Sequence, residues 1–569
     1  MNHETFFKNY ELLIDASNSV EELRELILQL AVEGKLVPQD PNEETSSVLF
    51  EKIIADKERL IKEKKFKKSQ TLPEIETDEI PFDIPKTWKW IRLNDVGDWG
   101  AGSTPDRKKP EYYEGSILWF KSGELNDGYI YDSEEKITED ALKHCSLRSN
   151  KPGDVLIAMY GATIGKVAIL EVEATTNQAV CACTCFSSIY NCYLFYLLKA
   201  YRRNFSNQGV GGAQPNISRQ KIIHTVAPLP PYEEQKRIVT KVDQLMALCD
   251  QLEARQQKKH EKRIRLNNAA LDKLLTAPTP REFAQHWQRI CDNFDLLYDA
   301  PEIVGQLQQA ILQLAVQGKL VAQDEGDEPA AVLVEKIKTE KERLIQQGKI
   351  KKSKTPSINI EKFPLPEGWI WVRLGTLCNL ITKGSSPKWQ GVNYVEPGNG
   401  VLFITSENVR NYNVNLDKSK YVEEKFNEIE PRSILKQNDI LMNIVGASIG
   451  RTAMYDRDEI ANINQAVCLI RVIGQENLLN LKYLLYFFNS PLCISFMFDK
   501  QVDNARANLS MGNISKFHIP LPPFEEQKRI VAKVDQLMAL CDELEAGLVQ
   551  TQTEGGKLME AVVHHVLAG

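Results

Sequence analysis

Several short motifs in this chain of 569 residues resemble parts of catalytic sites. GATIGKV, which begins at Gly161, looks like a phosphate-binding loop, but such a loop has the spacing GxxxxGK[ST]. Here Tyr160 occupies the position of the first glycine, and Val167 occupies that of the hydroxyl residue. GAGST at Gly100 lacks the third glycine of a dinucleotide-binding loop and runs into Pro105, which favours a turn. Neither motif predicts a nucleotide site.

Motifs for methyl transfer, DNA cleavage and metal binding are also incomplete. LPPY at Leu229 and LPPF at Leu521 carry leucine where an amino-methyltransferase has Asn or Asp, and leucine cannot accept a hydrogen bond from the amine to be methylated. A nuclease-like PD…ExK pattern can be assembled, but its Pro-Asp is followed by RKKP rather than by a strand. Three cysteines spaced by two share one face of a strand as small hydrophobic residues, and two adjacent histidines point to different faces of a helix. These residues are Pro105, Asp106, Glu134 and Lys136; Cys181, Cys183 and Cys185; and His564 and His565. No catalytic or metal site is predicted.

The composition is that of a folded multidomain protein with a small acidic excess. The chain has 70 Lys and Arg against 77 Asp and Glu, a formal net charge of −7, and 43% apolar residues. The excess lies outside two segments, because Trp88–Pro228 holds 16 basic and 15 acidic residues and Trp369–Pro520 holds 16 and 14. The net charge therefore does not exclude a nucleic-acid partner. No stretch approaches the roughly 18 apolar residues of a membrane span, and the first residues lack a signal-peptide profile, so we expect a cytoplasmic protein.

The chain is one long tandem duplication, which defines its architecture. Leu229–Ala254 returns as Leu521–Ala546 with 23 of 26 positions identical. Leu26–Asp40 returns as Ala310–Asp324, and the offsets between repeated blocks run from 284 to 292 residues. Each half therefore has a constant helical start, a variable middle and a constant helical end.

The variable segments keep sparse landmarks in the same order. These are WKWIRL at Trp88 and WIWVRL at Trp369, GATIG at Gly161 and GASIG at Gly446, NQAVC at Asn177 and Asn464, and NIS at Asn216 and Asn513. Between the landmarks, short strands alternate with turns. The pattern predicts two mixed α/β domains, and the glycines of GATIG and GASIG (Gly161, Gly165, Gly446 and Gly450) are expected to serve turn geometry.

The constant ends predict long helices. Residues 233 to about 275 have apolar side chains at the a/d spacing of a helix that packs on another helix, and the second copy predicts a helix over 525 to about 552 followed by another over 557–567. The predicted fold is α+β, with two mixed α/β domains separated by a long antiparallel pair of α-helices in a pseudo-two-fold tandem duplication. The expected regions are an N-terminal helical extension (1–70), a first mixed domain (71–228), a central helical region (229–355), a second mixed domain (356–520) and a C-terminal helical region (521–569).

Together, the duplication, the PLPPxxEQKRIV opening of each long helix and the WxWxRL entry to each variable segment resemble the specificity subunit of type I restriction–modification systems. The resemblance is to the subgroup with a helical extension before the first target-recognition domain, and it covers essentially the whole chain. It implies a non-catalytic subunit whose two target-recognition domains, about residues 80–228 and 362–520, each read half of a bipartite duplex DNA site. The paired helices would then set the spacer between the half-sites.

The resemblance also implies partners. Two methyltransferase subunits would dock on the helical regions, and restriction motor-nuclease subunits would join the assembly, which serves phage defence. S-adenosylmethionine, ATP and Mg are expected on those partner subunits and none in this chain. Two alternatives remain open, namely a repeat scaffold that binds only proteins, and a methyltransferase or nuclease with a cryptic active site. Steeply salt-dependent binding to duplex DNA would exclude the scaffold, and the absence of methyl transfer by the purified chain would argue against the enzyme.

Polar side chains that can reach base edges, and basic or small ones that can approach phosphate, are the candidate DNA contacts. In the first segment they are Ser103, Thr104, Arg107, Lys108, Lys109, Lys121, Ser122, Tyr160, Thr163, Lys166, Gln214, Asn216 and Arg219. In the second they are Lys383, Ser385, Ser386, Lys388, Trp389, Thr405, Ser406, Asn408, Arg410, Ser448, Arg451, Arg506, Asn508 and Ser510.

Overall fold

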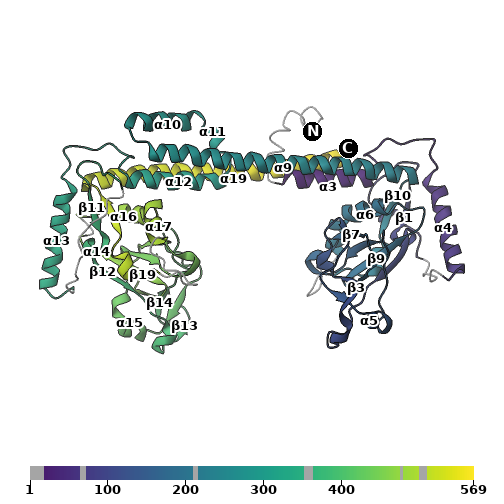
Figure 1. Cartoon of the computed structure of the whole chain (residues 1–569), viewed down its shortest axis with the longest axis horizontal. Helices are drawn as coiled ribbons and strands as arrows, with labels where there is room; N and C mark the ends of the chain where they lie inside the picture. Colours follow the sequence, from purple (N-terminus) through teal and green to yellow (C-terminus); the bar gives the residue numbers. More distant parts are fainter. Residues whose placement is uncertain are drawn as a thin grey trace. The chain divides into compact units, whose positions relative to one another are not determined.

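The computed structural model describes residues 18–64, 72–208, 216–350, 363–474, 478–498 and 509–568. The chain divides into two units, Met1–Lys259 with Gln552–Gly569 and His260–Thr551. Within the described residues, each unit contains two helices of the constant start, one mixed α/β domain and parts of two long helices (Figure 1). We call residues 88–229 head 1 and residues 369–521 head 2.

Unit 1 begins with α3 (Ser19–Val32) and α4 (Ser46–Lys62), which are followed by head 1. The strands of head 1 are β1 (Lys89–Arg92), β2 (Gly97–Ala101), β3 (Tyr113–Phe120), β4 (Tyr129–Ile130), β5 (Lys136–Ile137), β6 (Val155–Ala158), β7 (Val167–Leu170), β8 (Thr175–Thr176), β9 (Val180–Cys185) and β10 (Val226–Leu229). Its helices are α5 (Glu139–His144), α6 (Asn191–Ala200), α7 (Arg202–Gln208) and α8 (Arg219–His224). The long helix α9 (Tyr232–Thr276) follows, close to the predicted bounds.

Head 1 is built on a five-stranded sheet in the order β2-β9-β6-β7-β4, beside a three-stranded sheet in the order β5-β3-β8. Both faces of the larger sheet are buried, because successive side chains along a strand point to opposite faces and each face packs in its own apolar cluster. Val155 and Ile157 pack in a cluster that includes Leu194 of α6, whereas Leu156 and Ala158 pack in another. The strands β1 and β10 pair antiparallel at the base of the head and bring its first and last residues together.

Unit 2 repeats this series after the hairpin helices α10 (Pro280–Asp292) and α11 (Phe294–Leu297). Its constant-start helices are α12 (Pro301–Val316) and α13 (Ala330–Gln346). The strands of head 2 are β11 (Ile370–Arg373), β12 (Cys378–Lys383), β13 (Tyr394–Val395), β14 (Val401–Ile404), β15 (Lys420–Val422), β16 (Asp439–Asn443), β17 (Thr452–Tyr455), β18 (Ala461–Ile463), β19 (Val467–Val472) and β20 (His518–Leu521). Its helices are α14 (Leu374–Leu377), α15 (Lys425–Ile429), α16 (Leu481–Phe488), α17 (Pro491–Phe498) and α18 (Met511–Ile514), and α19 (Phe524–Ala568) follows.

Head 2 has the same sheet plan with small differences. The four-stranded sheet β12-β19-β16-β17 corresponds to the larger sheet of head 1, and a second sheet, also of four strands, has the order β13-β15-β14-β18. Ile440 and Met442 of β16 face one apolar cluster, and Leu441 between them faces another. The repeated plan confirms two mixed α/β domains in a tandem duplication.

In unit 2, the end of α9 runs parallel to α12. The Asn267 side-chain amide donates a hydrogen bond to Gln306 at 2.8 Å, and further along both segments the Lys319 ammonium donates to the carbonyl of Leu275 at 2.9 Å. Residue numbers rise together along the two segments, so they point the same way.

The other neighbour of α12 in unit 2 is α19, which runs in the opposite direction. Gln308 donates to the Asp542 carboxylate at 3.0 Å, and Gln323, in the turn after α12, donates to Glu526 at 3.1 Å. Because α12 is parallel to the end of α9 and antiparallel to α19, the two long helices run antiparallel in this unit, as predicted.

The prediction of two separate helices after residue 525 is wrong, since α19 is continuous from Phe524 to Ala568. Gly555 and Gly556 lie in the predicted gap, and glycine disfavours a helix interior by about 1 kcal/mol relative to alanine. Gly556 is buried instead, and a Cβ there would lie 3.0 Å from the side-chain oxygen of Asn18, just before α3. Close packing between the two helices explains the glycine.

The PLPPxxEQKRIV motif forms the junction between each head and its long helix. The Glu234 carboxylate accepts hydrogen bonds from the Trp88 indole at 3.0 Å and from the Gln39 amide at 2.6 Å. In unit 2, Glu526 accepts from the Trp369 indole at 2.9 Å in the same way. The duplicated Trp and Glu are therefore retained for one structural reason.

The neighbouring glutamine completes the junction. Gln235 accepts a hydrogen bond from the backbone N–H of Tyr190 at 2.9 Å and donates to the carbonyl of Pro230 at 3.0 Å. Its counterpart Gln527 accepts from the N–H of Asn480 at 2.9 Å and donates to a proline carbonyl at 3.0 Å. Each head is thus fastened to its own helix by buried polar contacts.

Replacing Glu234 with alanine is expected to destabilise unit 1 by about 1–3 kcal/mol, because the buried Trp88 indole and the Gln39 amide both lose their acceptor. Burial raises the pKa of Glu234 above the 4.5 of an exposed glutamate, so the folded state keeps this proton to higher pH than the unfolded chain. Stability should therefore fall as the pH rises from 4.5 through the raised pKa.

Glu234→Gln retains an acceptor and should lessen this pH dependence. Some pH dependence should remain, because burial also raises the pKa of Glu526. Denaturant unfolding between pH 4 and pH 7 measures both effects, with the exposed Glu233→Gln as control. Equal stability of Glu234→Ala and the parent would contradict the assignment.

Among the described residues, no single helix is long and apolar enough to cross a membrane. The bent pair α16 and α17 passes a test of length and composition jointly, with 57° between its helices. Most of its side chains, including Phe487 and Met497, are buried in the core of unit 2.

Candidate nucleic-acid interface

Three landmark motifs of head 1, GATIG, NQAVC and NIS, meet at one edge of the larger sheet. Strand β9 is antiparallel to both β2 and β6, so its first residues lie beside their last residues. Ala101 at the end of β2 is opposite Cys181, and Ala158 at the end of β6 is opposite Val180. The loops that follow β2 and β6 therefore lie beside the turn that precedes β9.

Backbone hydrogen bonds hold these loops together. The N–H of Gly102 donates to Val180 at 3.0 Å, and the N–H of Met159 donates to Ala179 at 2.8 Å. The segment before α8 joins them, since the N–H of Ile217 donates to Met159 at 2.9 Å. Gly102 is required here, because a Cβ would lie 2.1 Å from a backbone carbonyl oxygen.

A further loop reaches the same edge from β3. The N–H of Asn177 donates to the carbonyl of Phe120, the last residue of β3, at 2.9 Å. Lys121 and Ser122 follow directly and so lie beside the turn before β9. We define the loop edge of head 1 as residues 102–109, 121–122, 159–166, 176–180 and 216–219.

Head 2 has the same edge with the same backbone bonds. The N–H of Gly384 donates to Val467 at 3.4 Å, and that of Ile444 donates to Ala466 at 2.9 Å. The N–H of Leu509 donates in turn to Ile444 at 2.9 Å. The loop edge of head 2 comprises residues 383–389, 405–410, 444–451, 464–467 and 509–510.

The structure corrects one predicted equivalence, that of Asn216 with Asn513. Ser218 caps α8 by accepting from the N–H of Lys221 at 3.2 Å, and Ser510 caps α18 by accepting from the N–H of Asn513 at 3.1 Å. Asn513 therefore corresponds to Lys221, and the second NIS lies five residues beyond the structural equivalent. The duplicated position of Asn216 is 508, which lies outside the described residues.

The candidates in head 1 come from several chain segments and gather at its loop edge. Those on it are Ser103, Thr104, Arg107, Lys108, Lys109, Lys121, Ser122, Tyr160, Thr163, Lys166, Asn216 and Arg219, whereas Gln214 lies outside the described residues. Two cations among them are already paired. Arg107 and Lys121 both bind the Glu135 carboxylate, at 2.6 and 3.1 Å, and hydrogen bonding to Arg107 lowers the pKa of that carboxyl.

Some candidate side chains at the loop edge of head 2 are exposed, and others are buried. On it lie Lys383, Ser385, Ser386, Lys388, Trp389, Thr405, Ser406, Asn408, Arg410, Ser448, Arg451 and Ser510, and Arg506 and Asn508 are outside the described residues. Thr405 and Asn408 are only 6% and 2% exposed, and Asn408 accepts from the hydroxyl and N–H of Thr405. Their side chains hold the loop and do not face outward. Trp389, by contrast, is 75% exposed.

The sequence reasoning missed one pair of residues at this edge, Gln178 and Gln465. Gln178 is exposed and accepts a hydrogen bond from the Thr104 hydroxyl. The asparagine before each glutamine has a structural role, since the side chains of Asn177 and Asn464 each accept a backbone N–H within the turn. The signal was present, because NQAVC is identical in both halves while its surroundings differ.

The residues of the motifs that resemble enzyme sites make structural contacts within head 1. Asp106 accepts from the N–H of Lys108 at 3.0 Å, and Lys136 pairs with Asp132 at 3.3 Å. Cys181 and Cys183 are buried in the core of head 1, as predicted, and burial raises the pKa of Cys181 to about 12. Within the described residues, no group of three His, Cys, Asp or Glu side chains could hold a metal ion, and the side chains of His564 and His565 lie outside that description.

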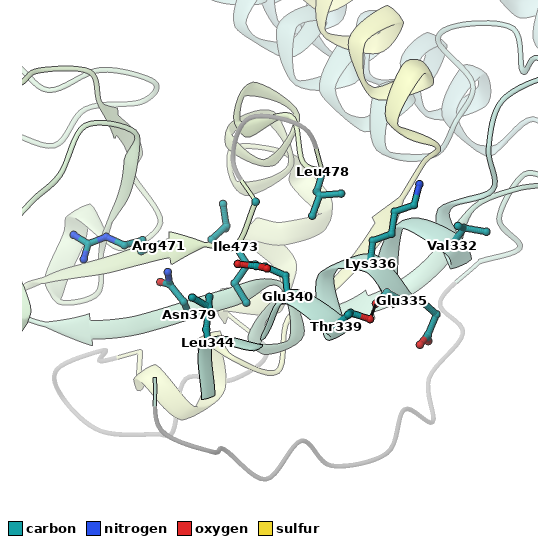
Figure 2. Close-up of a pocket in the computed structure, with 12 residues that line it drawn as sticks. Val332, Glu335, Lys336, Thr339, Glu340, Leu344, Asn379, Arg471, Ile473 and Leu478 are labelled. Atoms are coloured by element: carbon teal, nitrogen blue, oxygen red, sulfur yellow. Dashed lines mark hydrogen bonds between the residues drawn. The ribbon is translucent and has the colours of Figure 1, made fainter. Parts of the chain in front are cut away.

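A groove of 930 Å³ lies in unit 2 between α13 and the end of β19 away from the loop edge (Figure 2). It is lined by Val332, Glu335, Lys336, Thr339, Glu340, Leu344, Asn379, Arg471, Val472, Ile473, Gly474 and Leu478. Its charged groups are paired. Arg471 binds Asp439 and Lys336 binds Glu328, each at 2.6 Å. The two glutamates that line the groove, Glu335 and Glu340, each bind a basic residue of α13. With its charges already neutralised, the groove offers little to a polar ligand.

Comparison with known proteins identifies similar chains. The family described as "Type I restriction modification DNA specificity domain" matches residues 85–262 and 366–551. The chain is 33% identical to the type I restriction enzyme EcoAI specificity subunit of Escherichia coli over 551 residues, which cover 92% of this chain and 90% of that protein. It is 30% identical to the EcoEI specificity subunit of Escherichia coli over 583 residues, covering 96% and 94%. A solved chain from work on complex assembly and conformational transition of the type I R-M system is 20% identical, with a TM-score of 0.47 over 86% of this chain and 99% of that chain.

Proposed function

The chain belongs to the family of type I restriction–modification specificity subunits, and from this premise we propose how its heads and helices select a DNA site. It is a non-catalytic DNA-recognition subunit with two tandem DNA-specificity domains, which works with DNA and with the methyltransferase and restriction subunits of such a system. The alternatives of a protein-binding scaffold and of an enzyme with a cryptic site are not supported.

Each head reads one half of a bipartite duplex site through its loop edge. The observation that carries this proposal is that separate chain segments of each head bring polar and basic side chains to one edge of a rigid sheet. Sheet and helix residues that hold those loops are buried, so the loops can vary without loss of the fold. Two heads with different side chains on the same backbone would read two different half-sites.

The long helices set the gap between the half-sites. α9 and α19 each have 45 residues, which corresponds to about 68 Å at a rise of about 1.5 Å per residue. Each head is fastened to its own helix by the Trp–Glu and glutamine contacts, so a change in helix length should move the heads apart rather than be absorbed at a hinge.

We expect selection from a random duplex pool to yield a two-part motif with a fixed gap. Inserting one helical turn after Ala254 and another after Ala546 should then widen the gap by about one to two base pairs, since a turn adds about 5.4 Å and a base pair about 3.4 Å. The same insertion after Pro278, between α9 and α10, is the control and should leave the gap unchanged. A single continuous motif would refute the proposal.

The methyltransferase subunits dock on a repeated helix face. Leu248 of α9 and Leu540 of α19 are 57% and 54% exposed, although leucine is usually buried. Each is flanked by the same exposed alanine and glutamine, Ala247 with Gln244 and Ala539 with Gln536. Packing within the chain does not explain why these exposed residues stay identical, whereas two copies of one partner would.

The reaction chemistry is then left to the partners. S-adenosylmethionine would be held by the methyltransferase subunits, and ATP and Mg by the restriction subunits. We propose that this work takes place in the cytoplasm of a prokaryotic cell.

A further inference from the structure

The loop edges of the two heads share a backbone register, so their side chains can be compared position by position. Gly165 and Gly450 each donate from the backbone N–H to the last residue of β6 or β16 at 3.0 Å. One residue later, the N–H of Lys166 donates to Thr163 at 2.9 Å, and the N–H of Arg451 donates to Ser448 at 3.2 Å. Lys166 therefore corresponds to Arg451.

The same register makes Tyr160 the counterpart of Val445, because each precedes a glycine with positive φ, 64° at Gly161 and 74° at Gly446. No heavy atom lies within 4 Å of a Cβ built at either glycine, so the tip of this loop is open to a ligand.

Two features are common to both edges. A cation stands at the same place, as Lys166 or Arg451, and within the described residues neither pairs with a carboxylate. A glutamine also stands at the same place, as Gln178 or Gln465, in a turn whose backbone is fixed by the preceding asparagine.

Other positions differ between the heads. Tyr160 is 43% exposed and its counterpart is an aliphatic residue. The loop after Gly102 carries Arg107 where the loop after Gly384 carries Trp389, counted from the shared Gly-Ser. Arg107 is held by Glu135 and lies over two aromatic rings, whereas the Trp389 ring extends into solvent.

These differences separate two kinds of DNA contact. Phosphates and sugars are the same at every base pair, whereas base edges differ. A side chain whose type is shared by two heads that read different half-sites is suited to contact phosphates and sugars. A side chain that differs between the heads at the same backbone position is suited to contact base edges.

We propose that Lys166 with Gln178, and Arg451 with Gln465, hold the DNA backbone in one common register, and that Tyr160 in head 1 and Trp389 in head 2 face the bases and determine the half-site. This inference rests on the proposed function and assigns separate tasks within the loop edge. The shared pair positions each head on the duplex, and the residues that differ between the heads determine which bases are preferred.

The test uses the full-length chain assembled with its methyltransferase subunits and a random pool of duplex DNA, sequenced after selection. Lys166→Ala and Gln178→Ala should lower affinity for all selected duplexes alike, by about tenfold each, and leave the consensus unchanged. Lys166→Ala should also reduce the slope of log K against log salt concentration by about 0.9. Lys52→Ala is the matched control for a lost lysine, because Lys52 is an exposed residue of α4 outside the loop edge, and it should leave affinity and slope at the parent values.

Tyr160→Val, which introduces the head 2 residue, should change the preferred base at one or more positions of one half-site. Relative affinities at those positions should move by about 5- to 150-fold while the other half-site stays the same. Trp389→Ala should do this in the other half-site only.

The inference is overturned if Gln178→Ala changes the consensus, or if Tyr160→Val weakens all duplexes alike. The proposed function is judged separately, by whether the parent protein selects a two-part motif at all. Should the parent select such a motif while all four variants bind like it, the loop edge would not be the DNA surface. Circular dichroism of each variant confirms that the fold is retained.

Discussion

A chain in which residues 88–228 are replaced by a second copy of residues 369–520 is expected to recognise the half-site of head 2 twice. Because the two long helices run antiparallel in unit 2 and each head is fastened to its own helix, we expect the two copies in opposed orientation on the duplex. Binding to the original site should fall by roughly a hundredfold or more, since each mismatched base pair costs about 1–3 kcal/mol. Selection from a random duplex pool, compared with the parent protein, measures the change.

The junction contacts make this graft feasible. The incoming Trp369 can replace Trp88 as the donor to Glu234, because the same pair already exists with Glu526. The hydroxyls of Tyr193 and Tyr483 both donate to the proline carbonyl at the end of their head, Pro228 or Pro520. The graft therefore exchanges the loop edge and keeps the attachment.

The reciprocal graft, head 1 in place of head 2, is the control and should yield the other half-site twice. An unchanged sequence preference in either graft, with the protein folded and bound to its partners, would contradict independent reading by the two heads. A graft that reads a wholly new sequence would also contradict it.

Replacing both Leu248 and Leu540 with aspartate is expected to abolish association with the methyltransferase subunits. Burying a leucine side chain in an interface contributes about 1.5–3 kcal/mol, and an unpaired carboxylate buried in its place adds a further cost. Each single substitution should leave one methyltransferase subunit bound. Co-purification followed by light scattering gives the stoichiometry of each complex.

Ile460→Asp is the matched control, because Ile460 is a 63% exposed apolar side chain of head 2 outside the repeated helices. It should keep both partner subunits. Retention of both subunits by the double leucine variant would show that the repeated helix face is not the docking surface. Loss of both subunits from each single variant would show instead that the two faces do not act independently.

Local pattern was sufficient to predict several elements of this protein. The short apolar run Val155–Ala158 between turns placed a strand, and the a/d spacing along residues 233–275 placed α9 to within a residue. Gly161 and Gly446 both have positive φ, as their role in turns requires. These features depend on neighbours a few residues away, so they can be recognised in the sequence itself.

Local pattern failed where a distant contact decided the outcome. Two helices were predicted where α19 is one, because Gly556 packs against Asn18 and the helix continues through it. Thr405 and Asn408 looked like exposed polar residues, but both are buried, and the Asn408 amide donates to the carbonyls of Asn415 and Lys418 further along the chain. In each case the deciding partner cannot be identified from spacing.

The sequence alone determined that the chain is duplicated, that its ends are helical and that its middles are two mixed α/β domains, because repetition and periodicity are written in residue order. The tertiary structure decided which residues share a surface. Only the strand order β2-β9-β6 brings residues 102, 159 and 178 to one edge, and only the same order in head 2 pairs them with their counterparts. The physical reason is that strand pairing joins segments tens of residues apart, and which strands pair is settled by the packing of the whole core.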